Sequence, residues 1–229
     1  MENVIRIDKV SKIYRTGEVT VEALKEVSLT VAKGEFSAIA GPSGSGKTTL
    51  LNIVSGLDRP DAGTIELGGK ALTAMSASEL SDFRRDHIGF IFQSYNLIPV
   101  LTVEENIEYV MLLQGVPKGE RRKRVAKILT EVGLDGMRTR LPIHLSGGQQ
   151  QRVAVARAMV AKPDIILADE PTANLDSKTG HDLLDMMEEM NAKHGVTFLF
   201  STHDQMIMEH ARRLITLRDG KIFSDEMRG

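Results

Sequence analysis

The feature that most constrains this chain is a glycine-rich loop between an apolar run and a helical pattern. Residues 41–48 read GPSGSGKT and satisfy G-x-x-x-x-G-K-[ST], with the apolar run 36–40 before them and a helix expected over 48–57. The glycines let the backbone wrap tightly, so that successive N–H groups point at phosphate oxygens and the helix presents its positive end to them. We therefore expect a nucleotide site formed by Gly41, Pro42, Ser43, Gly44, Ser45, Gly46, Lys47, Thr48 and Thr49.

Two side chains of this loop have expected chemical tasks. Lys47 should reach the β and γ phosphates, and the Thr48 hydroxyl should ligate Mg²⁺. The alternative is an incidental glycine turn without a ligand, but the strand before the loop and the helix after it favour the nucleotide site.

The composition excludes several classes of protein. The chain has 229 residues, 29 Lys and Arg against 31 Asp and Glu, and no cysteine. Disulfides, thiolate metal sites and cysteine nucleophiles are therefore excluded. A net charge of −2 argues against a large nucleic-acid surface, so no nucleic-acid partner is expected. No window approaches the roughly 18 consecutive apolar residues of a membrane span, so we expect a chain that is soluble by itself.

The apolar runs predict an α/β fold. Runs over 36–40, 88–92, 165–168 and 196–200 are continuous rather than alternating, which is typical of strands covered on both faces in a mostly parallel sheet. Helical patterns over 48–57 and 176–193 lie between them, and methionines 186, 187 and 190 repeat as a core-facing stripe. Short segments within 4–31, together with 64–67, predict a small antiparallel flank.

One stretch breaks the alternation of strands and helices. Between 93 and 161, helix signals dominate: Thr102 with Glu105 fits a capping box, and helices are expected over 119–132 and 149–160. We expect one domain over 1–229, with a core of 1–92 and 162–229 and a helical insertion over 93–161. The basic run 118–124 is expected to be a solvated helix face.

Two carboxylates follow the apolar run 165–168 directly. Asp169 and Glu170 would lie at the carboxyl end of a buried strand, where ligands sit in such sheets. We expect Asp169 to hold Mg²⁺ through water, and Glu170 to orient or deprotonate an attacking water near the γ phosphate. The alternative for Glu170 is a loop acid that caps the next helix.

A second glycine-containing helix start lies within the insertion. Residues 145–149 read LSGGQ, and a serine with two glycines at a helix start exposes N–H groups and the positive helix end to an anion. A single nucleotide needs only one such loop. The simplest use of both is a head-to-tail pair of chains, in which Ser146, Gly147, Gly148 and Gln149 meet the nucleotide of the partner. The alternative is a helix start without a ligand.

Taken together, GPSGSGKT, ILADEPT and LSGGQ resemble the ATP-binding cassette ATPases over residues 2–222. The resemblance implies a P-loop NTPase core with an antiparallel flank and a helical subdomain. It also implies that Tyr14 stacks on adenine, that Gln93 contacts Mg²⁺ and the attacking water, that Asp176 lies in the loop touching the partner chain, and that His203 bonds the γ phosphate and holds Glu170 in line. Lys47, Glu170 and His203 are thus the expected catalytic residues.

The resemblance extends to a subclass. GFIFQSYNLIPVLTVEENI and ADEPTANLDSKTG are similar to cassettes of the lipoprotein-releasing and macrolide-export group, although that family usually carries glycine at Ala173. This implies an ATPase with ATP and Mg²⁺ as cofactors and an ATP-dependent homodimer. It also implies a separate integral membrane permease at the cytoplasmic face of the inner membrane, docking near Gln93 and 95–101.

Other functions remain alternatives. A cassette that powers a mechanical or regulatory membrane complex, of the cell-division type, would look much the same, because the cargo is recognised by the membrane partner. A cassette acting on nucleic acid or ribosomes usually has two cassettes or long coiled-coil insertions, and this chain has neither. A P-loop GTPase or kinase is a third alternative, but no N-K-x-D motif occurs and LSGGQ has no task in a kinase. Five further histidines are expected to be surface or packing residues: His87, His144, His181, His194 and His210.

Overall fold

A mixed six-stranded sheet organises the computed structural model, which describes residues 2–17 and 19–228. Its strand order is β10-β9-β3-β8-β7-β6, and all neighbours are parallel except β9 and β10. The α/β fold class is confirmed. The strands are β3 (Phe36–Ala40), β6 (Ile88–Ile91), β7 (Ile165–Asp169), β8 (Thr197–Thr202), β9 (Arg213–Arg218) and β10 (Lys221–Met227).

The central strands are buried on both faces, as their continuous apolar runs predict. Along β7, Ile165 and Leu167 face one core, and Ile166 and Ala168 face the other. The first core also contains α1 (Lys47–Val54) and the antiparallel sheet, whereas the second contains most of the other helices. Because β3, β6, β7, β8 and β9 run parallel, their carboxyl ends meet at one edge of the sheet.

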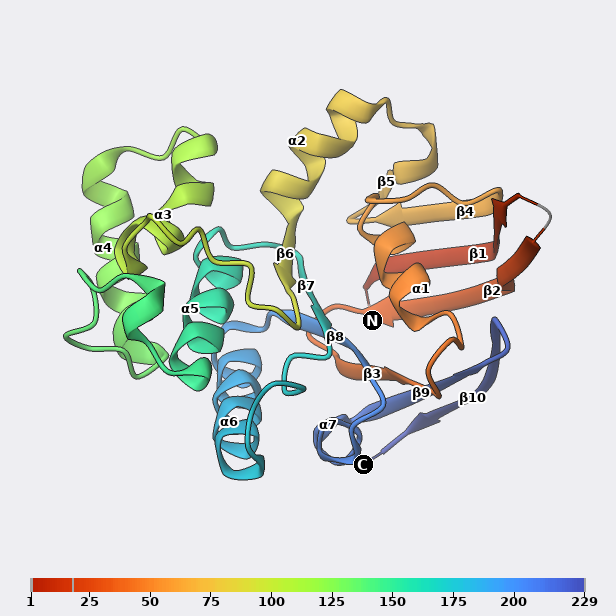
Figure 1. The fold of residues 1–229 in the computed structure, drawn as a ribbon. Coiled ribbons are helices and arrows are strands. Elements are labelled where there is room, and N and C mark those ends of the chain that lie inside the picture. The colour runs from red at the N-terminus through yellow and green to blue at the C-terminus, as the bar shows by residue number, and fades with distance from the viewer. Residues whose placement is uncertain (1, 18, 229) are drawn as a thin grey trace.

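The antiparallel flank is a separate four-stranded sheet of order β2-β1-β4-β5. Its first two strands are long, not the short segments joined by turns that the sequence favours. β-Bulges interrupt their register on either side of Lys12, which explains the broken pattern of apolar residues. In Figure 1 this sheet lies at the right, next to α1. The strands are β1 (Asn3–Thr16), β2 (Val19–Ala32), β4 (Ala62–Leu67) and β5 (Lys70–Ala71).

All regular elements between β6 and β7 are helical, and they lie together at the left of Figure 1. Thr102 caps the first of them: its hydroxyl accepts from Glu105 N at 3.3 Å, and its own N–H donates to Glu105 Oε2 at 2.8 Å. The predicted capping box is therefore confirmed. These elements are α3 (Val103–Leu113), α4 (Lys118–Glu131), η2 (Pro142–His144) and α5 (Gly147–Val160).

The remaining helices flank the sheets. The methionine stripe of the long helix α6 is buried at Met186, Met187 and Met190, so its assignment to core packing is confirmed. None of the helices in the described residues is both long and apolar enough to cross a membrane. α2, α7, β9 and β10 are not among the elements expected from the sequence. The helices are η1 (Leu72–Ala74), α2 (Ala77–His87), α6 (Ser177–His194) and α7 (Gln205–His210).

Candidate active site

The glycine-rich loop (residues 41–48) joins the carboxyl end of β3 to the amino end of α1. A Cβ atom at Gly41 would lie 2.2 Å from the Leu217 carbonyl oxygen, and one at Gly46 would lie 2.4 Å from that of Ala23. Gly46 also has φ 103°, in the left-handed region that glycine accepts most easily. The loop is thus packed against neighbouring backbone too closely for side chains at these positions.

Two buried polar groups of the loop point to an anionic ligand. The Lys47 ammonium donates to the carbonyl oxygens of Gly41 at 2.8 Å and Pro42 at 3.1 Å. Ser45 Oγ is buried and has no hydrogen-bond partner among the described residues. A buried hydroxyl normally has a partner, so the loop fits a bound phosphate that supplies one.

Asp169 ends β7 opposite the start of α1. Both of its carboxylate oxygens lie 3.4 Å from Thr48 Oγ1. Burial raises the pKa of this carboxyl, with a further contribution from the charge of Glu170, so the anion lacks a full set of neutralising partners. Hard divalent cations prefer such oxygen ligands. No group of three His, Cys, Asp or Glu side chains in the described chain could hold a metal, so phosphate oxygens or water would complete the ligands.

Glu170 is held in place by the end of β8. Its carboxylate accepts from Thr202 Oγ1 at 3.0 Å and from the His203 backbone N–H at 3.1 Å, and it lies 2.6 Å from His203 Nδ1. Its φ of 46° is unusual for a residue with a side chain. The Glu170 side chain is 13% exposed and that of His203 is 70% exposed. The histidine therefore stands in solvent above a fixed carboxylate.

A cavity of about 610 Å³ borders this group of residues, and we refer to it as the loop cavity. It brings together, from five separate parts of the chain, most of the residues expected to contact one nucleotide. The expected residues that line it are Tyr14, Ser43, Gly44, Gly46, Lys47, Thr48, Thr49, Gln93, Glu170 and His203.

Tyr14 stands at the mouth of the loop cavity with its hydroxyl anchored. Tyr14 Oη donates to Asp58 Oδ2 at 2.7 Å, and Lys12 Nζ donates to Asp58 Oδ1 at 2.8 Å. Burial opposes ionisation of Asp58, but these two hydrogen bonds, a third from the Arg59 N–H and the charge of Lys12 together lower the pKa of the carboxyl. Neither Asp58 nor Lys12 is among the residues expected from the sequence. Asp58 lies in a Gly-, Pro- and Asp-containing turn, which predicts only a change of chain direction.

The LSGGQ segment (residues 145–149) lies away from the loop cavity. Ser146 caps α5 by accepting from Gln149 N at 3.3 Å, and none of these described residues lines that cavity. A Cβ atom at Gly148 would lie 2.4 Å from Thr179 Cγ2, so the start of α5 abuts the first turn of α6. Asp176 caps that turn, since its Oδ1 accepts from Thr179 N at 3.0 Å. Ser146 to Gln149 and Asp176 therefore lie close to one another but outside the loop cavity.

Two side-chain amides connect the surroundings of the LSGGQ segment to the residues around the loop cavity, and neither is among the residues expected from the sequence. Gln151 Nε2 of α5 donates to the Pro171 carbonyl oxygen at 2.7 Å, next to Glu170. Asn174 Nδ2 donates to the Gln93 carbonyl oxygen at 2.9 Å. Gln151 stands in a run of three glutamines, and nothing in the sequence distinguishes the buried one from its half-buried neighbours.

Comparisons with known proteins agree with this geometry. The family model described as ABC transporter matches residues 24–173. The ABC transporter ATP-binding protein YtrE of Bacillus subtilis (strain 168) is 46% identical over 221 residues, covering 96% of each chain. The macrolide export ATP-binding/permease protein MacB 2 of Yersinia pestis bv. Antiqua (strain Antiqua) is 43% identical over 224 residues. That match covers 98% of this chain but only 33% of that protein.

Solved structures show the same fold. The dimeric structure of MJ0796, described as a bacterial ABC transporter cassette, matches with a TM-score of 0.90 and 43% identity, covering 98% of this chain and 99% of that one. A dimeric post-hydrolysis state of MJ0796 bound to ADP and Pi matches with a TM-score of 0.89 and 42% identity over the same shares.

Proposed function

The chain belongs to the ABC transporter family, and we propose that it is the ATP-hydrolysing subunit that drives a separate membrane permease. The family assignment makes it an ATP-binding domain. In our proposal residues 1–92 and 162–229 form the ATPase core, and residues 93–161 form a helical subdomain that carries the LSGGQ segment. The single observation that carries the proposal is that the LSGGQ segment, the second helix start proposed to bind an anion, lies outside the loop cavity.

The loop cavity is the proposed ATP site. The N–H groups of the glycine-rich loop and Lys47 would hold the phosphates, and Tyr14 would stack on adenine. Thr48, Asp169 and Gln93 would hold Mg²⁺, which neutralises phosphate charge when bound. The oxygen ligands and the incompletely neutralised Asp169 fit that ion.

Glu170 and His203 are the proposed hydrolytic pair. Glu170 would orient or deprotonate the attacking water. His203 lies 2.6 Å from that carboxylate and is largely exposed, so its ring can hold Glu170 and also reach a γ phosphate. Because phosphoryl transfer depends mainly on positioning and charge neutralisation, a site that lacks some of its donors is slow.

The missing donors would come from a second copy of the chain. In a head-to-tail dimer, Ser146, Gly147, Gly148 and Gln149 of one copy would contact the γ phosphate held by the other, with Asp176 near the same interface. The dimeric structures of MJ0796, one of them with ADP and Pi, support this arrangement. ATP would join the two copies, and hydrolysis would release them.

The work of this cycle would go to a membrane permease of the lipoprotein-release or macrolide-export type. MacB 2, which combines ATP-binding and permease parts by its name, supports this assignment for about a third of its length. We propose docking near Gln93 and 95–101, at the joint between core and helical subdomain. The chain would then work at the cytoplasmic face of the inner membrane, held there by the permease, without a nucleic-acid partner.

The variant Glu170→Gln tests the proposal. It removes the base but keeps the size of the side chain, so we expect ATP binding to persist, turnover to be lost, and light scattering to show a dimer in saturating Mg-ATP. Glu189→Gln is the matched control, because Glu189 is exposed on α6, away from the loop cavity. The proposed head-to-tail dimer is wrong if Glu170→Gln binds ATP and stays monomeric.

A further inference from the structure

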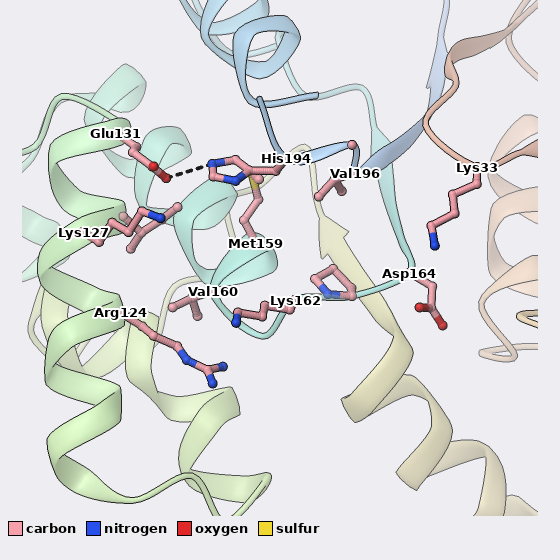
Figure 2. Close-up of a pocket in the computed structure, with 13 residues that line it drawn as sticks. Lys33, Arg124, Lys127, Glu131, Met159, Val160, Lys162, Asp164, His194 and Val196 are labelled. Carbon is pink, nitrogen blue, oxygen red and sulfur yellow. Dashed lines mark hydrogen bonds and ion pairs between the residues drawn. The ribbon is translucent and has the colours of Figure 1, made fainter. Parts of the chain in front are cut away.

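A second cavity lies at the opposite edge of the central sheet from the loop cavity. We call it the basal cavity; its volume is about 440 Å³ and Figure 2 shows it. Lys33 precedes β3, residues 162–164 precede β7, and Val196 precedes β8, while α4 closes the other side. None of the described residues lines both cavities. The basal cavity is therefore not part of the proposed ATP site.

Hydrogen bonds between loops hold the walls of the basal cavity together. The buried Asn191 Nδ2 donates to the carbonyl oxygens of Gly34 at 3.0 Å and Val196 at 2.7 Å. Gly34 N–H donates to Thr197 Oγ1 at 3.0 Å, and Asp164 N–H donates to the His87 carbonyl oxygen at 2.9 Å. These loops are thus fixed to one another without a ligand, as in most preformed small-molecule sites.

The carboxylates of this cavity already have partners. Glu131 accepts from Lys193 Nζ at 2.7 Å and lies 3.2 Å from His194 Nε2. Asp164 Oδ2 lies 2.8 Å from His87 Nδ1. Both carboxylates therefore have their direct partners outside the group formed by Lys33, Lys127 and Lys162.

Positive charge remains in excess around the opening. Arg124 pairs with Glu120 at 2.8 Å, but no ion pair joins Lys33, Lys127 or Lys162 to any residue of the described chain. In Figure 2, the Arg124 side chain extends from α4 toward the loop that carries Lys162, and Lys127 projects from the same helix one turn further along. An anion placed between α4 and this loop would meet ammonium groups from both sides.

The floor of the basal cavity is apolar, and a lysine next to it has a costly backbone conformation. Ile128, Met159, Val160, Pro163 and Val196 line the floor. Lys162 has φ 56°, a left-handed conformation that a non-glycine residue adopts at a cost of about 1 kcal/mol. Glycine would avoid that cost.

We propose that the basal cavity binds a small organic phosphate, with its phosphate between Lys127 and Lys162 and its apolar body on the floor. The cavity volume lies in the range of small-molecule sites. A ligand here would contact the residues that lead into β7 and β8, and Glu170 and His203 follow the other ends of these strands. It would also contact the last turn of α5, the helix that starts at the LSGGQ segment.

Fluorescence titration with 1-naphthyl phosphate tests the proposal, with 1-naphthol as the uncharged probe of the same body. The wild-type chain is kept in saturating Mg-ADP, so that the proposed ATP site is filled. We expect saturable binding of the phosphate and at least about tenfold weaker binding of 1-naphthol, because a charge-assisted hydrogen bond is lost. Absence of saturable binding of 1-naphthyl phosphate in saturating Mg-ADP, or equal binding of both probes, overturns the proposal.

Lys162→Gly separates binding from folding. It removes the ammonium group and relieves the left-handed backbone, so we expect an unchanged or higher Tm with about tenfold weaker binding of 1-naphthyl phosphate. Lys127→Ala should weaken binding similarly, whereas Lys123→Ala, on the same helix but outside the cavity, should not. Unchanged affinity in both Lys162→Gly and Lys127→Ala contradicts the proposed site.

Discussion

At the scale of single residues, the proposed adenine-stacking group is held by contacts outside the expected motifs. Lys12 Nζ lies 5.1 Å from the centre of the Tyr14 ring and also donates to Asp58, which in turn accepts from Tyr14 Oη. Asp58 follows the end of α1, the helix that begins at the glycine-rich loop. The phosphate-binding and adenine-stacking parts of the proposed site are thereby joined through α1 and the short turn that follows it.

Tyr14→Phe should weaken ADP binding although it keeps the aromatic ring. Loss of the hydroxyl frees the ring from Asp58, and a net hydrogen-bond contribution of about 0.5–1.5 kcal/mol corresponds to a two- to tenfold rise in Kd. Asp58→Ala should have a similar effect, and the double variant should be no worse than either single one, because both remove the same bond. Calorimetry checks this, with Tyr109→Phe on α3 as control. Unaltered affinity in Tyr14→Phe would show that the ring acts without its anchor.

At the scale of elements, the contact between α5 and α6 sets the place of the LSGGQ segment. Gly148→Ala should lower Tm by about 2–4 °C, because overpacking against Thr179 Cγ2 at 2.4 Å outweighs the better helix propensity of alanine. Thr179→Ser deletes that methyl group and keeps the hydroxyl that bonds Asp176. In this background Gly148→Ala should no longer destabilise.

Gly119→Ala on α4 is the control for this element. Nothing lies within 4 Å of a Cβ atom there, so the substitution should raise Tm through helix propensity alone. Thermal unfolding of the wild type, the three single variants and the double variant separates the two effects. A Tm for Gly148→Ala that does not depend on residue 179 would contradict the packing argument.

Sequence patterns predicted elements where the signal was local. The apolar run 36–40 became β3 without change, and the Thr102–Glu105 capping box begins α3. The missed α2 begins with the same kind of box, Ser76 with Glu79, and the turn of the missed β9–β10 hairpin contains Asp219-Gly220. Those signals were present in the sequence. By contrast, the Tyr14–Asp58 bond joins residues 44 positions apart across a bulged strand, and no local pattern encodes it.

At the scale of the whole molecule, the two helix starts proposed to bind anions belong to different surfaces. α1 opens into the loop cavity, whereas α5 begins at the LSGGQ segment, which lines no part of it. A single copy can therefore hold a nucleotide without completing the proposed ring of donors around the γ phosphate. This separation makes hydrolysis by the proposed mechanism a property of two copies.

The ATPase rate per subunit should therefore fall on dilution in saturating Mg-ATP. Well below the dimer dissociation constant, the dimerised fraction is proportional to total concentration, so a tenfold dilution should lower the rate per subunit about tenfold. Initial rates across a dilution series measure this, with carrier protein present to prevent losses to surfaces. Reconcentration of a diluted sample should restore the rate, which distinguishes dissociation from inactivation. A rate per subunit that stays constant down to the lowest measurable concentration would mean that one copy completes its own site.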